Sequence, residues 1–243
     1  MVAAQRESVV LPDWIAYAGH MAGSEEPNLV AGRAVRLRQL RRPMEATDRF
    51  AAVLAPLNDD GKALVERTRS WVGALDYHHP GQSRETYLAH PHRVATMYVE
   101  QAPHPTADGI VTALAHNVLE VTNTSEEALV EHLGRGPAAA ISVLTVDRAR
   151  QEDPAYLRAY YQAISETPLA PSVKVLDKVD NLYLLCLNAN DRVRTRYLAE
   201  IEEHLIPLAR ASIPSVVPLI GALVEDNRRL GHRPLEVLMT EVE

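Results

Sequence analysis

Apolar residues recur at intervals of three and four along most of the chain beyond residue 60, and this spacing constrains the fold more than any other feature. In one such segment, Leu64, Thr68, Trp71 and Leu75 fall on a single helix face. No segment shows the strict apolar–polar alternation of a half-buried strand. Only one residue is Phe, whereas Leu, Val and Ala predominate, which favours helix-on-helix packing. The sequence therefore predicts an all-α fold.

Capping residues and prolines predict several helix boundaries. Thr124, with Glu127 three residues on, matches a capping box that opens the segment EEALVEHLG. Asp153 followed by Pro154 predicts the first turn of the next helix. Pro91 is expected in the first turn of a helix over HPHRVATMYVEQ, where the missing N–H of proline does no harm. The segment TADGIVTALAHNVLEV is expected to form one helix.

The chain divides into three parts. Four prolines cut residues 1–59 into short pieces, which predicts an N-terminal helical extension. Residues 60–212 are expected to form the main domain, and residues 213–243 a C-terminal helical extension packed on it. The one dense basic run, RAVRLRQLRR over Arg33–Arg42, would spread its arginines broadly around a helix. Its simplest interpretation is a solvated helix or a contact between copies.

Net charge and composition limit the kinds of partner that the protein is expected to bind. The net charge of −7 argues against nonspecific binding to nucleic acid or anionic lipid. The single cysteine, Cys186, cannot form an internal disulfide and is expected to be a small buried apolar side chain. There is no apolar run of about 18 residues and no apolar core of a signal peptide. We expect a cytoplasmic protein that binds a small molecule, with assembly into a homo-oligomer left open.

Three short segments set chemically active side chains in apolar surroundings. LAHP carries His90, ALAHNVLE carries His116, and VKVLDKVDN carries Asp177. Polar groups flanked by Leu and Val are costly to bury without partners. Two histidines and a carboxylate from three helices would satisfy one another through a divalent metal. Taken singly, each has an ordinary alternative, such as a hydrogen-bonded core histidine or a salt bridge between Asp177 and Lys174 or Lys178.

The order and flanks of these segments resemble a known family. HPHRVA, LAHNVLEVT and VKVLDKVDNL look like the three core motifs of the HD superfamily of metal-dependent phosphohydrolases. The most similar branch is the RelA/SpoT type, which removes pyrophosphate from the alarmone (p)ppGpp and reads roughly HPxxVA, LLHDVVEDT and KLADRLxN. Upstream, HPGQSRETYLAHP resembles its HxGQxRKxGxPYxxHP segment, though three residues shorter between Arg84 and His90. The resemblance covers about residues 60–212 and implies an HD-type helical bundle with extra terminal helices.

The resemblance also implies metal ligands. His90, His116 and Asp177 match the ligands of the family, and Asn117 stands where the family has its namesake aspartate. The implied ion is Mn²⁺, which a mixed histidine and carboxylate set permits. Asn117 keeps an oxygen ligand but removes one negative charge, so metal affinity should fall.

The predicted catalytic residues are Glu120, His116 and Lys174, and the predicted substrate-binding residues are Arg84, Asn181 and His79. Glu120 matches the first member of a Glu-Asp pair that activates the attacking water, and Val121 replaces the second. Because valine cannot shuttle a proton, Glu120 would act alone, and a lost acid–base group costs about 10²–10⁴ in rate.

Three functions stay open at this point. The first is a hydrolase of a phosphorylated, nucleotide-like substrate with a drifted active site. The second is an HD scaffold redirected to non-hydrolytic and metal-independent acid–base chemistry in specialised metabolism, with His116, Glu120 or His79 as acid and base. The third is a non-catalytic module that binds a ligand.

Overall fold

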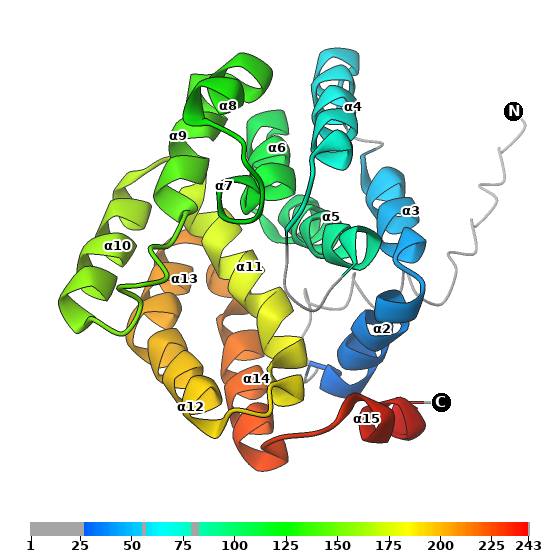
Figure 1. The fold of residues 1–243 in the computed structure, drawn as a ribbon, viewed down its shortest axis with the longest axis vertical. Coiled ribbons are helices and arrows are strands. Elements are labelled where there is room, and N and C mark those ends of the chain that lie inside the picture. Colours follow the sequence, from blue (N-terminus) through cyan, green and yellow to red (C-terminus); the bar gives the residue numbers. More distant parts are fainter. Residues whose placement is uncertain (1–26, 55–56, 79–82, 243) are drawn as a thin grey trace, which may run out of the picture.

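The computed structural model describes residues 27–54, 57–78 and 83–242, and within these ranges it consists of helices and connecting turns without a β-strand (Figure 1). The predicted all-α class is confirmed. In chain order the α-helices are α2 (Leu29–Arg41), α3 (Met44–Val53), α4 (Asp59–Ala74), α5 (Arg84–Gln101), α6 (Ala107–Ala115), α7 (Val118–Val121), α8 (Glu126–Leu133), α9 (Arg135–Leu144), α10 (Pro154–Glu166), α11 (Ala170–Leu184), α12 (Asp191–Glu200), α13 (Ile206–Ser212), α14 (Val217–Leu230) and α15 (Leu235–Val242). Short 3₁₀ turns η2 (Leu185–Leu187) and η4 (Pro214–Val216) and a π-helical turn η3 (Ile201–Leu205) complete the set.

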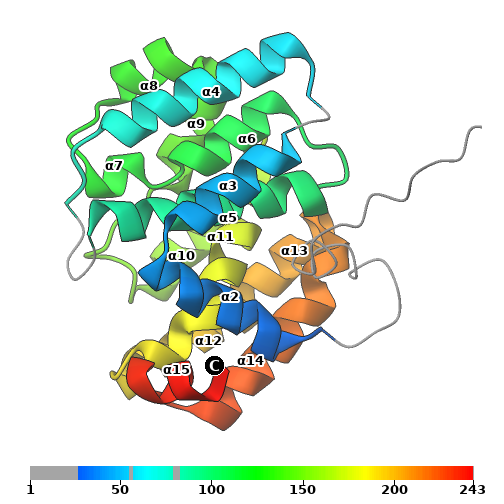
Figure 2. The ribbon, with the colours of Figure 1, turned by 90° about the vertical axis from the view of Figure 1, so that its right-hand side faces the viewer.

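Helix α11 runs through the middle of the molecule, with α5 and α6 on one side and α13 and α14 on the other (Figures 1 and 2). Its residues Leu176, Val179 and Leu182 belong to the main hydrophobic core. Four charged residues of the same helix are at most 9 % exposed: Lys174, Asp177, Lys178 and Asp180. Charges buried this deeply need partners, and the partners define the site described below.

Helix α5 begins earlier than the sequence indicated. Ser83 is its N-cap, since the Ser83 side chain accepts a hydrogen bond from the backbone N–H of Thr86. Pro91 therefore lies inside the helix, and its predicted place in the first turn was wrong. An internal proline removes one helical hydrogen bond, yet α5 continues to Gln101 because its middle is packed against α3, α6 and α11. His90 consequently lies mid-helix rather than at a helix start.

The predicted single helix over residues 106–121 is two helices. Helix α6 ends at Ala115, and α7 begins at Val118 after a turn formed by His116 and Asn117. The predicted capping residue Thr124 was also wrong. Ser125 caps α8 instead, accepting a hydrogen bond from the N–H of Ala128. The predicted helix start at Asp153 and Pro154 is confirmed by the start of α10.

Helix α2 contains the basic run, and much of that run is internal. Arg33 and Arg36 are buried and form ion pairs with Asp226 and Asp180, so the interpretation as a solvated helix was wrong for these two arginines. A Cβ atom at Gly32 would lie 2.5 Å from the Tyr183 ring, so glycine lets α2 approach α11 closely.

The terminal helices pack on the middle of the chain. Helices α2 and α3 contact α5, and α14 contacts α11 and α13. The division at residues 60 and 212 stays a prediction, because the packing continues across both points. Cys186 is fully buried, as expected. Among the helices that the structure describes, none combines the length and the apolar character that a bilayer crossing requires.

Candidate metal centre

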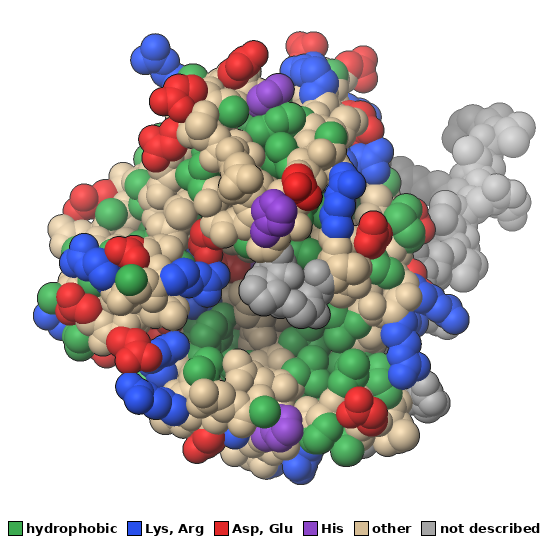
Figure 3. Space-filling model, in the orientation of Figure 1, with side chains coloured by type: hydrophobic (Ala, Val, Ile, Leu, Met, Phe, Trp, Pro, Cys, Tyr) green, Lys and Arg blue, Asp and Glu red, His purple; other side chains and the backbone are tan. Residues whose placement is uncertain are grey.

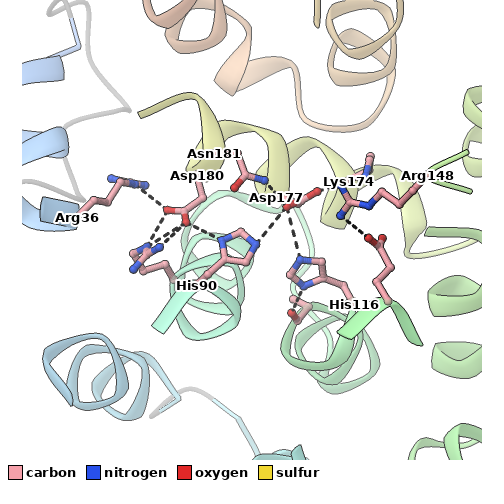
Figure 4. Close-up of polar contacts among 11 residues, drawn as sticks. Arg36, His90, His116, Arg148, Lys174, Asp177, Asp180 and Asn181 are labelled. Atoms are coloured by element: carbon pink, nitrogen blue, oxygen red, sulfur yellow. Dashed lines mark hydrogen bonds and ion pairs between the residues drawn. The ribbon is translucent and has the colours of Figure 1, made fainter. Parts of the chain in front are cut away.

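Three helices bring His90, His116 and Asp177 together (Figure 4). His90 comes from α5, Asp177 from α11, and His116 from the turn that ends α6. One nitrogen of each histidine and one oxygen of the carboxylate lie within 4.8 Å of one another. Asp177 Oδ1 is 3.2 Å from His90 Nε2 and 3.6 Å from His116 Nε2. The residues expected from three separate sequence segments therefore share one site.

The other ring nitrogen of His90 is occupied by the protein. Nδ1 lies 2.8 Å from Oδ2 of Asp180, which as a carboxylate accepts the Nδ1 hydrogen. Nε2 is thereby left facing Asp177. Burial by itself lowers the pKa of His90, but hydrogen bonds to Asp177 and Asp180 outweigh it and raise the pKa above its ordinary value. In the absence of a cation, Nε2 can hold a proton that a metal ion would displace.

His116 shows the same arrangement. Its Nδ1 lies 2.7 Å from the carbonyl oxygen of Ala113, and because a carbonyl only accepts, Nδ1 carries the hydrogen. In a neutral ring, Nε2 then carries the lone pair. It is buried and has no hydrogen-bond partner in the part of the chain that the structure describes. Such an orphaned acceptor is unfavourable unless something electropositive binds it.

Asp177 is fixed from three directions. Its Oδ1 accepts a hydrogen bond of 2.8 Å from Asn181 Nδ2, and Lys174 Nζ lies 3.3 Å from Oδ2. Burial alone would raise the pKa of Asp177, but the Lys174 ammonium and the two neighbouring histidines hold it well below its ordinary value. The side chain is thus a carboxylate at neutral pH.

The donor set fits a divalent cation. Two imidazole lone pairs and one carboxylate oxygen converge, and both histidines donate their second N–H to an acceptor, as metal-bound histidines do. Nitrogen and oxygen ligands of this kind suit Mn²⁺, Zn²⁺ or Fe²⁺. The residues would leave part of the coordination sphere to water or substrate.

Asn117 occupies the N-cap position of α7, with no side-chain hydrogen bond to that helix. Its side chain interacts with the hydroxyl of Tyr87 on α5. Burial raises the pKa of Tyr87 well above its ordinary value, with Asn117 acting in the opposite direction. A role for Asn117 as a metal ligand remains a prediction.

Glu120 lies beside the centre on α7, and its carboxylate is held by a residue that sequence reasoning missed. Arg148 Nη2 is 2.6 Å from Glu120 Oε2, and the backbone N–H of Val146 donates to Oε1 at 3.4 Å. The Glu120 side chain is 9 % exposed and that of Arg148 is 70 % exposed. Burial lowers the pKa of Arg148, but Glu120 outweighs it and the pKa is raised. No spacing pattern in the sequence joins these two residues.

Lys174 is buried against Asp177 and the ring of Tyr160, whose centroid is 5.5 Å from Nζ. Burial alone would lower the pKa of Lys174, but Tyr160 and Asp177 raise it, so the side chain is an ammonium. Tyr160 in turn donates a hydrogen bond of 2.6 Å to the carbonyl of Leu144. Lys174 therefore supplies positive charge beside the centre.

The predicted substrate-binding residues differ in how they lie relative to the centre. Asn181 is exposed on α11. In the same orientation as Figure 1, the face of the molecule shown in Figure 3 is hollowed near its middle. Arg84 is exposed at the start of α5. His79 lies outside the described residues. The structure brings Asn181 to the centre through Asp177, whereas it shows no contact between Arg84 and the three candidate ligands.

No family model matches the sequence, and no curated protein matches it either. Solved structures do match. One of them belongs to the work entitled "A metazoan ortholog of SpoT hydrolyzes ppGpp and plays a role in starvation responses". The match has a TM-score of 0.54 and 19 % identity, and covers 72 % of this chain and 98 % of that chain. At this identity the match shows a shared fold alone, and that fold agrees with the one that the motif resemblance implied.

Proposed function

We propose that this protein is an HD-type phosphohydrolase that holds a divalent cation, Mn²⁺ by preference, and acts on a phosphorylated, nucleotide-like small molecule. One observation carries the proposal. In both His90 and His116, Nδ1 is hydrogen-bonded to an acceptor of the protein, and Nε2 faces the same oxygen of Asp177. This arrangement of two ring nitrogens around one carboxylate oxygen is typical of a metal site, in which each histidine donates its other N–H to an acceptor.

The chemistry divides between the cation and the chain. A bound divalent ion polarises a phosphoryl oxygen and lowers the pKa of coordinated water. Lys174 and Arg148 bring positive charge to the site and would attract a phosphorylated ligand. Glu120 is the carboxylate that would accept a proton from the attacking water, and a substrate phosphate would compete with it for Arg148.

The substrate class rests on the fold and on these charges. The structural neighbour hydrolyses ppGpp, a nucleotide with additional phosphates. Asn181 is exposed beside Asp177 and would contact the substrate directly. Arg84 and His79 are proposed to complete the substrate-binding wall. The three-residue shortening between Arg84 and His90 would alter that wall relative to the alarmone hydrolases.

A second candidate function is metal-independent acid–base chemistry on the same scaffold. It is favoured by Asn117, which interacts with Tyr87 and brings no negative charge to the centre. Val121 is buried and supplies no second acid–base group. In this case His116 and Glu120 would move protons, and Asn117 would orient the ligand.

Metal binding and phosphate release together test the proposal. Purified protein should bind Mn²⁺ by isothermal titration calorimetry and release phosphate or pyrophosphate from at least one member of a nucleotide panel. His116→Ala should abolish Mn²⁺ binding, and Glu120→Gln should lower kcat by about 10²–10⁴. His92→Ala is the matched control, because His92 is a buried histidine of α5 that contacts Phe50 and the Leu88 carbonyl instead.

Restoring a carboxylate by Asn117→Asp should tighten Mn²⁺ binding if position 117 faces the ion. Turnover that persists in a chelator would exclude the metal-dependent hydrolase. Turnover that also survives Glu120→Gln would exclude both candidate mechanisms. Saturable ligand binding without conversion would identify a binding module.

A further inference from the structure

Asp180 is a buried carboxylate that neither the motifs nor the proposed reaction uses. It is 1 % exposed, on the turn of α11 that follows Asp177. Its Oδ1 accepts hydrogen bonds from Arg36 Nε at 2.7 Å and Arg93 Nε at 2.9 Å. Its Oδ2 accepts one from Arg93 Nη2 at 2.8 Å and lies 2.8 Å from His90 Nδ1. Figure 4 shows the chain of contacts from Arg36 through Asp180 to His90 and Asp177.

We propose that Asp180 is a positioning residue for His90, and that Arg36 of α2 anchors it, so that cation affinity depends on the docking of helix α2. The inference rests on the proposed metal centre. It also assigns a role to the basic run of α2, which the proposed reaction leaves unexplained.

The charges explain why Asp180 orients His90 rather than deprotonating it. An unpaired buried carboxylate beside an imidazole would be a strong proton acceptor. Arg93 and Arg36 bring two positive charges against one negative charge. Both guanidinium groups donate hydrogen bonds to the Asp180 oxygens. Asp180 therefore stays a fixed acceptor, and the Nδ1 hydrogen stays on His90.

That hydrogen decides which nitrogen is free. A neutral imidazole has one N–H and one lone pair. With the hydrogen held on Nδ1, the lone pair of His90 lies on Nε2, which faces Asp177 Oδ1 at 3.2 Å. Carboxylate partners of this kind fix the tautomer and ring orientation of metal-bound histidines.

Arg36 ties this arrangement to α2. The guanidinium lies 3.8 Å from the centroid of the Tyr183 ring, and Nη1 donates to the carbonyl of Gly32 at 3.0 Å. Arg33, one turn earlier, donates Nε to the Tyr183 carbonyl at 3.0 Å. These contacts fix α2 against α11 at the level of Asp180. A displacement of α2 would take away one of the two arginines that hold Asp180.

The test compares Mn²⁺ affinity in matched variants of the full chain. Asp180→Asn should weaken Mn²⁺ binding about 10–100-fold, the usual effect of losing an outer-shell partner. Glu100→Gln is the control, because Glu100 is a half-buried carboxylate of α5 that pairs with Arg49 of α3 at 2.8 Å and has no contact with the centre among the described residues. The control should destabilise the fold and leave Mn²⁺ affinity within about twofold of wild type.

Arg36 supplies a variant that keeps Asp180 and Arg93 in place. Arg36→Gln should weaken Mn²⁺ binding by a smaller factor than Asp180→Asn, and Arg36→Lys should restore part of the loss by returning the charge without the planar fork. In metal-free protein at a pH where His90 is neutral, ¹⁵N spectra should show the His90 hydrogen on Nδ1 in wild type. In Asp180→Asn that hydrogen should move toward Nε2.

The outcomes separate this inference from the proposed function. Wild type that binds Mn²⁺ without hydrolysing any nucleotide removes the function and leaves the inference standing. A folded Asp180→Asn protein with wild-type Mn²⁺ affinity overturns the inference and leaves the function standing. Equal losses in Asp180→Asn and Glu100→Gln would reduce Asp180 to a stabilising residue. Wild type that binds no Mn²⁺ overturns both.

Discussion

Replacing Asp177 by Asn tests whether the centre is electrostatically organised before any cation binds. Lys174 Nζ lies 3.3 Å from Asp177 Oδ2, and both side chains are 8 % exposed. With an effective dielectric constant of about 20, two unit charges at that distance attract by about 5 kcal/mol. The substitution removes this attraction while keeping the shape of the side chain.

The net effect is smaller than the gross attraction, because asparagine also escapes the cost of burying a charge. Breaking one partner of a buried ion pair costs about 3–5 kcal/mol, since the other charge stays behind uncompensated. Lys174 would be that charge, close to the ring of Tyr160 but without its carboxylate. We expect the free energy of unfolding of the metal-free protein to fall by about 3–5 kcal/mol.

Urea denaturation in the presence of a chelator measures this difference, with the m-value checking that the transition stays two-state. Asp191→Asn is the control: Asp191 pairs with Arg194 at 2.8 Å but is 86 % exposed, so its loss should cost less than about 1 kcal/mol. If Asp177→Asn costs no more than this control, the reasoning about Lys174 is refuted. A double-mutant cycle with Lys174→Met would then show a coupling near zero.

Two further predictions concern pH and packing. The pKa of His90 is raised above 6.5, so the stabilisation by His90 is complete below pH 6.5 and is lost as pH rises through the folded-state pKa. The pKa of Asp177 is lowered below 3.8, so the stabilisation by Asp177 is complete above pH 3.8 and is lost as pH falls through the folded-state pKa. The metal-free protein should therefore be most stable between these limits in a urea series across pH, and His90→Gln should abolish the alkaline decline; an unchanged decline would place its source elsewhere. Gly109→Ala should destabilise the fold by about 1–3 kcal/mol in thermal or urea unfolding, because the new Cβ would lie 2.0 Å from the Tyr98 hydroxyl oxygen. Gly73→Ala, in open space on α4, is the control and should be neutral or stabilising; equal effects at both positions would contradict the packing argument.

The residues of the centre could be predicted because their chemistry is local in the sequence. A histidine or aspartate set among Leu, Val and Ala on a helix has few compatible surroundings, and three such segments in a fixed order limit the fold. His90, His116 and Asp177 met as expected. The fold class could be predicted because apolar periodicity is also a local property of the sequence.

The partners of the centre could not be predicted, because they lie far away along the chain. Arg36 and Asp180 are 144 residues apart, and Glu120 and Arg148 are 28 residues apart. Nothing local in RAVRLRQLRR distinguishes a buried arginine from a solvated one. The helix break at His116 was missed for a related reason. ALAHNVLEV has good helical periodicity, and the turn shows in the backbone of Asn117, whose φ of −106° and ψ of 1° leave the helical region.

The pairing of charges around the centre connects Asn117 to the proposed substrate. Asp177 faces Lys174, Glu120 faces Arg148, and Asp180 faces two arginines, so each nearby carboxylate already has a cationic partner. A divalent ion would add two positive charges to a site where Asp177, Glu120 and Asp180 are already paired with cations. An aspartate at 117 would have supplied a further negative charge, and asparagine does not. An anionic ligand can supply it instead, since its phosphates would bind the ion and draw Arg148 from Glu120. By linkage, the cation and a phosphorylated ligand should then each strengthen the binding of the other, and asparagine in place of aspartate at position 117 should make that mutual dependence stronger.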